Sequence, residues 1–412
     1  MLPAHPTSTL IDAELTPEQA AHLECVCAHL RERIAAAGGW LPFAEFMNQA
    51  LYAPGLGYYA AGATKLGAAG DFVTAPEISD LFSEVVALQL IEGLRLAEGG
   101  STARRGAASV LELGPGSGRL AAVALREMQR LDALPDAFLL LEVSADLRER
   151  QRATIARIAG ADALRRVRWL ERLPEHLTGV IFANEVLDAL PVERFVMRHG
   201  HAQRLGVVAA GGGFAWQPSA GTATDADPRF SLERDQVLTQ ALRQPLPEGY
   251  VGELGIGIAP LIRALGTALD CGVVMLVDYG LPRSPYYLPE RVRGTLRCHF
   301  RHRAHDDPLL LPGLTDITSW VDFTRVAEAA DDCGLAVAGF ATQAAWLLAG
   351  GLEQRFAAVL QSGDVARVRR AHEARQLLLP GEMGEAVKVI ALTRGVQAVP
   401  SGFRLQDLRD RL

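Results

Sequence analysis

An acidic residue and three regularly spaced glycines are the residues of this chain whose types and spacing most clearly imply a bound ligand. They lie in the run Val110-Leu-Glu-Leu-Gly-Pro-Gly-Ser-Gly118, which starts as a short apolar segment and precedes a helical pattern at Arg119. Glycine lets the backbone turn sharply and approach a ligand closely, because it has no Cβ. The helix that follows presents unpaired N–H groups at its first turn. The run therefore predicts a strand, a ligand-binding turn and a helix.

Three kinds of ligand use a turn of this type. A phosphate-binding P-loop ends in Gly-Lys-Ser/Thr, but this turn ends in Gly118-Arg119-Leu120, so the P-loop is excluded. A dinucleotide fingerprint needs G-x-G-x-x-G, and Arg119 stands where the third glycine allows close packing of helix and strand. The S-adenosylmethionine turn, E/D-x-G-x-G-x-G, is matched at every position from Glu112 to Gly118.

S-adenosylmethionine also suits the chemistry of this turn. The molecule has no phosphate for the turn to wrap, and the Glu112 carboxylate at the strand end can face its cationic amino-acid part. A glycine-rich loop without a ligand is the alternative interpretation. The cofactor-binding residues predicted in the turn are Glu112, Gly114, Pro115, Gly116 and Gly118.

A second acid follows the next apolar segment. One predicted helix separates the glycine turn from the apolar segment 137–143, and Glu142 lies at the end of that segment. A carboxylate at the end of the second strand can accept hydrogen bonds from both ribose hydroxyls of a nucleoside. Dinucleotide enzymes use the same device, so Glu142 indicates a nucleoside cofactor without deciding which one. Glu142 and the adjacent Val143 are predicted to contact the cofactor.

A third polar group follows the apolar segment 179–183. Asn184, Glu185 and Asp188 stand where that strand ends, at the edge at which open α/β sheets bind ligands. If the chain turns helical there, Glu185 and Asp188 share a face. Two such acids could orient a guanidinium through paired hydrogen bonds, and Asn184 could contact the acceptor or the adenosine. These three residues are the predicted catalytic residues; the alternative is that the acids only cap a helix.

Composition limits the classes of function. The chain has 412 residues, 49% of them hydrophobic, with a formal net charge of −7 and no long basic run, so nucleic-acid binding is not expected. We expect no membrane span, because no apolar run reaches about 18 residues, and we see no secretory signal pattern at the N-terminus. Five scattered cysteines suit a reducing cytoplasm. A homodimer is left open.

The element pattern predicts an α/β fold of the Rossmann-like class I methyltransferase type. We expect an N-terminal helical, cofactor-covering segment at 1–107, with helices at 17–37 and 42–52 and a capping box of Thr74 and Glu77 opening a helix to about 97. A core at 108–394 follows, with insertions at about 195–260 and 344–380, and then a tail at 395–412. The second insertion is expected to be a lid or a flank. Seven strands, mostly parallel with the last antiparallel, are expected at 109–113, 137–143, 166–170, 179–184, 272–278, 335–342 and 386–393.

Taken together, the motifs resemble the MidA-like family of class I S-adenosylmethionine-dependent methyltransferases, from about residue 41 to residue 393. The matching segments are Leu51-Tyr-Ala-Pro-Gly-Leu-Gly-Tyr-Tyr59, Gly70-Asp-Phe-Val-Thr-Ala-Pro-Glu-Ile-Ser79, Glu112-Leu-Gly-Pro-Gly-Ser-Gly118, Ala183-Asn-Glu-Val-Leu-Asp-Ala-Leu-Pro191, Asp278-Tyr-Gly280, Gly294-Thr-Leu-Arg297, Asp316-Ile-Thr318, Val321-Asp-Phe-Thr324 and Met383-Gly-Glu385. The sequence departs from the family at Met383-Gly-Glu-Ala-Val-Lys388, where Ala-Val replaces an expected Lys/Arg-Phe-like pair.

The resemblance implies a role for each matching segment. Gly114, Gly116 and Glu142 would touch S-adenosylmethionine, Asn184 and Glu185 would face the site, and a segment containing Gly70, Asp71, Thr74 and Glu77 would close over the cofactor. Mitochondrial members of the family are complex I assembly factors that methylate a protein arginine. The resemblance therefore implies a protein substrate presenting an arginine, with S-adenosylhomocysteine as the product.

Other residues leave their roles open. His299, His302 and His305 are expected in a loop that lines the substrate side or is solvated, and no metal site is predicted. Asp278 or Tyr279 either approaches the acceptor or forms a strand-end turn, and Glu253 either joins the site or caps a helix. The competing functions are a scaffold protein that binds S-adenosylmethionine without catalysis and a small-molecule N- or O-methyltransferase.

Overall fold

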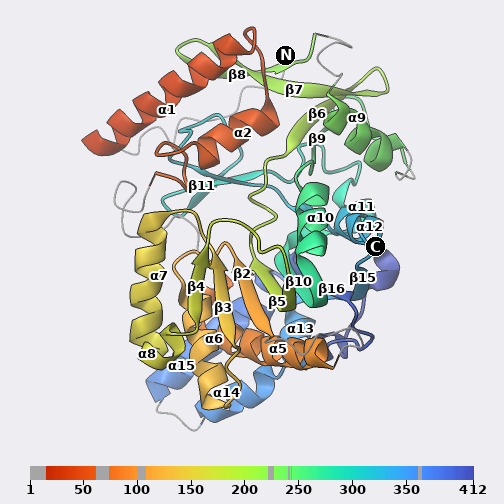
Figure 1. Ribbon diagram of the computed structural model, residues 1–412. Coiled ribbons are helices and arrows are strands. Elements are labelled where there is room, and N and C mark those ends of the chain that lie inside the picture. The colour runs from red at the N-terminus through yellow and green to blue at the C-terminus, as the bar shows by residue number, and fades with distance from the viewer. Residues whose placement is uncertain are drawn as a thin grey trace. The chain divides into compact units, whose positions relative to one another are not determined.

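The computed structural model describes residues 15–61, 74–99, 108–220, 227–239, 242, 244–360 and 364–412 (Figure 1). The chain divides into two compact units. The smaller unit contains the described part of Met1–Phe72 together with Leu205–Gln217 and Arg297–Ile317, and the larger unit contains the rest.

The larger unit is built on a twisted sheet with a clear ligand-binding edge. Its seven main strands lie in the order β15-β16-β10-β5-β2-β3-β4, and β16 runs antiparallel to both of its neighbours. This arrangement confirms the predicted seven-stranded, mostly parallel sheet. A further short strand, β14 (Val321–Asp322), pairs with the end of β10. The main strands are β2 (Ser109–Leu113), β3 (Ala137–Leu141), β4 (Val167–Leu170), β5 (Leu177–Asn184), β10 (Leu269–Leu281), β15 (Ala336–Thr342) and β16 (Val387–Arg394).

The register of the central strands aligns the polar segments that follow them. Leu113, the last residue of β2, lies beside Leu141 of β3 and Ala183 of β5. Parallel strands in this register end at the same edge of the sheet. The residues that come next in each segment, including Gly114, Glu142 and Asn184, therefore lie close together at that edge.

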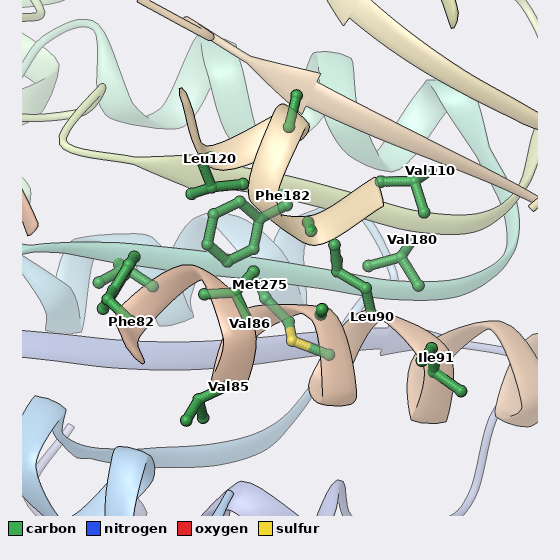
Figure 2. Packing of buried hydrophobic residues seen from close by; sticks show 14 of the residues in the cluster. Phe82, Val85, Val86, Leu90, Ile91, Val110, Leu120, Val180, Phe182 and Met275 are labelled. Atoms are coloured by element: carbon green, nitrogen blue, oxygen red, sulfur yellow. The ribbon is translucent and has the colours of Figure 1, made fainter. Parts of the chain in front are cut away.

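Helices cover both faces of the sheet because successive strand residues point to opposite faces. Val180 and Phe182 of β5 enter one core, while Ile181 and Ala183 enter the other. In Figure 2, Val86 and Leu90 of one helix lie toward Val180, Phe182 and Met275 of the sheet, whereas Val85 lies on another side of that helix; all belong to one core. The first face carries α5 (Asp80–Glu98) and α6 (Arg119–Arg130), and the second carries α10 (Ile258–Ala268) and α12 (Phe323–Asp332).

The segment expected to be a lid or a flank is a flank. Trp346, Leu352 and Leu377 are buried in the same core as α5. Its helices are α13 (Gln343–Ala349), α14 (Leu352–Leu360), α15 (Asp364–Leu378) and α16 (Met383–Ala386). They are preceded in the chain by α7 (Ala145–Ile158), α8 (Gly160–Leu164) and α11 (Arg283–Tyr286), and followed by the short helices η2 (Ser401–Phe403) and η3 (Arg409–Arg411).

The other predicted insertion contains short strands, as expected from its glycines. Within the larger unit, β6 (Glu193–Arg198) pairs antiparallel with β9 (Val251–Leu254). The α-helix α9 (Pro228–Arg234) continues into a short π-helix, η1 (Asp235–Thr239). Two buried ion pairs hold this region: Arg204 binds Glu193, and Arg325 binds Glu233 at 2.7 Å.

The smaller unit contains the N-terminal helices and two small sheets. Thr16 and Gln19 form a capping box for α1 (Pro17–Ala36), which confirms the first predicted helix. The second, α2 (Phe43–Tyr52), is also present. The strands are β1 (Leu41–Pro42), which pairs with β7 (His201–Ala210), then β8 (Gly213–Pro218), and a separate sheet of β11 (Arg297–Phe300), β12 (Arg303–His305) and β13 (Asp316–Thr318). No described helix in either unit is long and apolar enough to cross a membrane.

Candidate functional site

The glycine turn after β2 has the backbone that its sequence predicts. Gly114, Gly116 and Gly118 have φ angles of 58°, 50° and 78°, in the left-handed region that favours glycine. The turn closes through a hydrogen bond from the Gly118 N–H to the Pro115 carbonyl at 2.8 Å. A Cβ at Gly116 would meet no described atom within 4 Å. The backbone at Gly116 is therefore open to a ligand.

The Glu112 carboxyl lies buried at the base of this turn. Its side chain follows the apolar residues of β2, and its Oε2 has no hydrogen-bond partner among the described residues. Burial raises the pKa of this carboxyl to about 8. An uncompensated polar group in such a place is costly, and a cationic ligand would compensate it. This orphaned oxygen and the open glycine turn fit S-adenosylmethionine, whose sulfonium supplies the methyl group when the cofactor is bound.

Glu142 is placed at the same edge, directly after β3. That strand ends at Leu141, two residues earlier than predicted. One carboxylate oxygen of Glu142 accepts the Ser144 backbone N–H at 2.9 Å, and the other accepts the Gln151 amide at 3.1 Å. Since each carboxylate oxygen can accept a second hydrogen bond, Glu142 can still receive ribose hydroxyls. The neighbouring Val143 is 76% exposed.

The acids after β5 lie in an irregular turn, which we define as residues 184–188 and call the acid turn. The prediction that Glu185 and Asp188 share a helix face is wrong, because Glu185 has φ 53° and the chain does not turn helical. A non-glycine residue in this region is strained and often marks a functional position. Asp188 is buried. The Asn184 amide donates to Glu185 Oε1 at 2.9 Å, and the Asn184 Oδ1 is buried without a partner among the described residues.

Asp278 explains why the acid turn departs from a helix. Its Oδ2 accepts three consecutive backbone N–H groups, from Val186 at 3.1 Å, Leu187 at 2.8 Å and Asp188 at 3.3 Å. Its Oδ1 accepts the Tyr279 N–H at 2.8 Å. Burial raises the pKa of the Asp278 carboxyl, the Glu185 charge adds to this effect, and the backbone donors oppose it. Asp278 therefore fixes the backbone of the acid turn through these hydrogen bonds.

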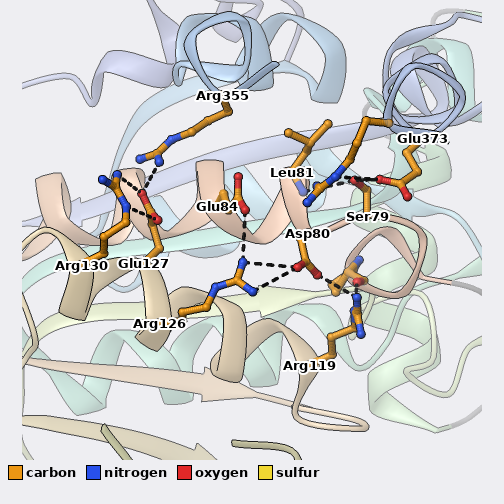
Figure 3. Close-up of polar contacts among 12 residues, drawn as sticks. Ser79, Asp80, Leu81, Glu84, Arg119, Arg126, Glu127, Arg130, Arg355 and Glu373 are labelled. Carbon is orange, nitrogen blue, oxygen red and sulfur yellow. Dashed lines mark hydrogen bonds and ion pairs between the residues drawn. The ribbon is translucent and has the colours of Figure 1, made fainter. Parts of the chain in front are cut away.

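A short segment from Thr74 to Asp80 contacts both the glycine turn and the acid turn. The Ala75 N–H lies 3.3 Å from Glu185 Oε1, and the Ser117 hydroxyl donates to Glu77 Oε1 at 2.5 Å. Figure 3 shows the Arg119 guanidinium reaching Asp80, with a distance of 2.8 Å. These contacts place the segment beside both turns; that it closes over the cofactor, as the family resemblance implies, stays a prediction.

The predicted capping box in this segment is wrong. Thr74 makes no capping hydrogen bond to the short helix α4 (Ala75–Ile78), and the long helix α5 begins later, at Asp80. Ser79 caps α5 by accepting the Leu81 N–H at 3.2 Å. Gly70 and Asp71, the other residues of the predicted closing segment, lie outside the described residues.

The residues whose roles were left open fall into different places. His299 and His305 lie on a β-hairpin in the smaller unit, with His302 in its turn, so the predicted loop is wrong. Tyr59 belongs to the same unit and donates to Asp316 at 2.7 Å. Glu253 lies buried on β9 and accepts the Thr295 N–H at 2.8 Å, which excludes a helix-capping role.

Three comparisons with known proteins agree on the class of enzyme. A family model of S-adenosyl-L-methionine-dependent methyltransferases matches residues 85–341. A Burkholderia thailandensis protein crystallised with S-adenosylhomocysteine is 36% identical, with a TM-score of 0.87, and the match covers 97% of this chain and 99% of that one. A native crystal structure of a COG1565 superfamily protein from the same organism gives 35% identity and a TM-score of 0.86, over 97% of this chain and 99% of that one.

Relatives with assigned activities are more distant but match nearly the whole chain. The mitochondrial protein arginine methyltransferase NDUFAF7 homologue of Drosophila melanogaster is 29% identical, over 90% of this chain and 85% of its own. NDUFAF7 of Homo sapiens is 29% identical, over 88% of this chain and 82% of its own. With the glycine turn, Glu112 and Glu142 at one edge of a seven-stranded sheet, this chain belongs to the MidA-like family of class I S-adenosylmethionine-dependent methyltransferases.

Proposed function

We propose that this methyltransferase transfers the methyl group to a guanidinium nitrogen of an arginine in a protein substrate. The observation that carries the proposal is the position of the acid turn against the glycine turn. A Cβ at Gly114 would lie 2.9 Å from Val186 Cγ2. The residues that flank Val186 therefore stand next to the predicted cofactor site, and Glu185 is one of them.

The chemistry of an arginine acceptor suits these acids. A guanidinium nitrogen attacks the methyl carbon only when a lone pair is localised on it, and the product must lose a proton. Carboxylates can orient a guanidinium through paired, charge-assisted hydrogen bonds. Glu185 Oε1 is held by Asn184 and Ala75, so the side chain has a fixed orientation before the substrate arrives. In-line transfer then needs positioning and the exclusion of water rather than a covalent enzyme intermediate.

Two further observations support a protein arginine as the acceptor. Curated relatives that match about nine tenths of this chain are protein arginine methyltransferases. The net charge of −7 favours encounter with cationic segments of a partner protein.

Labelling of a cell extract tests this proposal. S-adenosylmethionine carrying a labelled methyl group is added, with the purified enzyme, to an extract from cells that lack the gene. We expect a labelled protein band that yields methylarginine on acid hydrolysis. Label confined to small molecules would instead indicate a small-molecule N- or O-methyltransferase. The absence of any label, with S-adenosylmethionine still bound in calorimetry, would indicate a scaffold protein.

A further inference from the structure

Gln151 is a buried residue of α7 that joins three segments of the cofactor site. Its side chain is fully buried. Its Nε2 donates to the Gly116 carbonyl at 2.9 Å and to Glu142 Oε2 at 3.1 Å. Its Oε1 accepts the indole N–H of Trp169, on β4, at 2.8 Å. The amide thus connects the glycine turn, the predicted ribose-binding acid and the neighbouring strand.

The orientation of this amide is fixed by the chemistry of its partners. An indole nitrogen can only donate, so it must face the amide oxygen of Gln151. The carbonyl of Gly116 and the carboxylate of Glu142 are acceptors, and the NH₂ group supplies one hydrogen to each of them. All three contacts are satisfied in a single orientation of the side chain. A flipped amide would lose all three.

The backbone at Gln151, like its side chain, lies very close to the glycine turn. A Cβ at Gly118 would lie 2.9 Å from Gln151 Cα. Gly118 therefore permits α7 to approach the turn closely enough for the amide to reach the Gly116 carbonyl. The second oxygen of Glu142 is held by the Ser144 N–H, so both oxygens of that carboxylate are restrained.

We propose that Gln151 is a positioning residue for the nucleoside part of the cofactor. It sets the separation between the glycine turn and Glu142 and aims the remaining lone pairs of the Glu142 carboxylate at the ribose hydroxyls. The inference rests on the predicted contact between Glu142 and the ribose, and it does not depend on the identity of the methyl acceptor.

Two substitutions separate positioning from simple packing. Gln151→Met keeps the size of the side chain but removes all three hydrogen bonds. Gln151→Glu keeps the shape and places a carboxylate beside the Glu142 carboxylate and the Gly116 carbonyl. Only a protonated glutamic acid can donate a hydrogen there, to one of the two acceptors, so part of its function should return as the pH is lowered. The matched control is Gln343→Met. Gln343 lies on α13, is equally buried, and donates a hydrogen bond to the Leu377 carbonyl at 3.1 Å.

Calorimetric titration of the full-length enzyme tests the proposal with two ligands. The ligands are S-adenosylhomocysteine and an analogue that lacks the ribose 2′-hydroxyl. We expect the unaltered enzyme and Gln343→Met to bind the analogue about tenfold or more weakly than the parent compound. We expect Gln151→Met to bind the parent compound more weakly and to discriminate between the two ligands by less than about threefold. Compared with the unaltered enzyme at the same pH, Gln151→Glu should regain part of its affinity between about pH 8 and pH 5, where a glutamic acid in such a site takes up one proton and can donate one hydrogen bond.

Each alternative outcome has a defined meaning. If folded Gln151→Met keeps the discrimination of the unaltered enzyme, Gln151 only fills space and the inference is overturned. A Gln151→Glu variant whose affinity, divided by that of the unaltered enzyme at the same pH, does not depend on pH overturns it as well. If the unaltered enzyme binds both ligands equally well, Glu142 does not bind the ribose hydroxyls and the inference is overturned. Labelling of protein arginine is measured separately, so none of these outcomes bears on the proposed acceptor.

Discussion

The carboxylate of Asp278 accepts the backbone N–H of Leu187 at 2.8 Å, across 91 positions of the chain. The same carboxylate oxygen also accepts the backbone N–H groups of Val186 and Asp188, so the acid turn is held by one buried carboxylate. The strained Glu185, just before these donors, is thereby kept in its left-handed conformation. The geometry of the predicted catalytic residues is set by a residue on the adjacent strand.

We therefore expect Asp278→Asn to impair methyl transfer more than cofactor binding. An amide has one acceptor oxygen, so its NH₂ group must face either the three donors of the turn or the Tyr279 N–H. One unsatisfied buried contact costs about 1–3 kcal/mol, and if the acid turn moves to relieve it, we expect turnover to fall by about tenfold to hundredfold. Affinity for S-adenosylhomocysteine should change by only a few fold.

Turnover, ligand affinity and thermal midpoint are measured together for this variant and for Asp322→Asn. Asp322 is also buried, but it caps α12 and pairs with Arg283, so its loss should lower stability without this selective effect. Equal losses of turnover and affinity in Asp278→Asn would contradict the positioning role.

Glu185→Gln tests the proposed role of the acid turn directly. The amide keeps the size of the side chain and one acceptor oxygen, but it cannot provide the charge that orients a guanidinium. We expect methyl transfer to fall by at least about a hundredfold, since charge-assisted hydrogen bonds of this type are strong. S-adenosylmethionine affinity, measured by calorimetry, should stay within a few fold. A large loss of affinity would show instead that Glu185 contacts the cofactor.

Glu112 predicts a pH dependence with a defined sign. Its pKa is raised to about 8 by burial, while an unfolded chain loses that proton near the ordinary glutamate value of about 4.3. Between these values the folded state binds more protons, so the stability of the ligand-free enzyme should fall as the pH rises. A cationic ligand favours the ionised carboxylate, so its affinity should rise with pH and level off above about 8.

The Glu112→Gln variant provides the comparison for both effects. Its unfolding midpoint in urea should depend less on pH between about 5 and 8, because the titrating group is gone. Titration with S-adenosylmethionine in buffers of different ionisation enthalpy should show proton release for the unaltered enzyme only. Identical pH profiles for the two proteins would show that Glu112 is not the titrating group.

The contact between Arg119 and Asp80 predicts a dependence on salt. Both side chains are only partly exposed, and Asp80 also receives Arg126 at 3.3 Å (Figure 3). We expect Asp80→Asn to weaken cofactor binding several fold and to make it less sensitive to salt, because the ion pair that holds the segment is lost. Glu84→Gln is the control, since Glu84 pairs with Arg126 and not with Arg119. Equal effects of the two substitutions on cofactor affinity would argue against a specific role for the Arg119 contact.

Two glycines should respond to alanine differently, one mainly in stability and the other mainly in cofactor binding. A Cβ at Gly179 would lie 2.0 Å from the Ser109 carbonyl oxygen of the neighbouring strand, and its φ is 138°. We expect Gly179→Ala to cost several kcal/mol or to prevent folding, because two strands would have to separate. Gly116 has open space, so Gly116→Ala should cost only about 1–2 kcal/mol in backbone strain while weakening cofactor binding. Urea unfolding and calorimetry distinguish the two outcomes.

The sheet could be predicted from the sequence because each central strand is an apolar run that ends in a polar or glycine residue. The glycine turn was predictable for the same local reason. The acid turn was not, because Asp278 lies far along the chain and competes successfully with the helical hydrogen bonds expected after Asn184. The Asp278-Tyr279-Gly280 motif was the available signal, but nothing in it identifies the three backbone donors.

The cap of α5 illustrates a second limit. Thr74 and Ser79 are both good capping residues, and Glu77 made Thr74 the better match to a capping box. In the structure the Glu77 side chain accepts the Ser117 hydroxyl, and the Thr74 side chain makes no capping hydrogen bond. Gln151 shows a third limit, because a polar residue on an amphipathic helix gives no sign that it will be fully buried.

Arg119 has a consequence for selectivity among metabolites that contain adenosine. Its guanidinium is committed to the Asp80 carboxylate and the Pro76 carbonyl at the start of α6. Dinucleotide enzymes have a glycine at this position of the turn, whereas here the position holds an arginine whose charge is already paired with a carboxylate. ATP and NAD carry the same base and sugar as S-adenosylmethionine and are abundant in every cell. We therefore expect ATP and NAD to compete only weakly with S-adenosylmethionine, which a calorimetric displacement titration would measure.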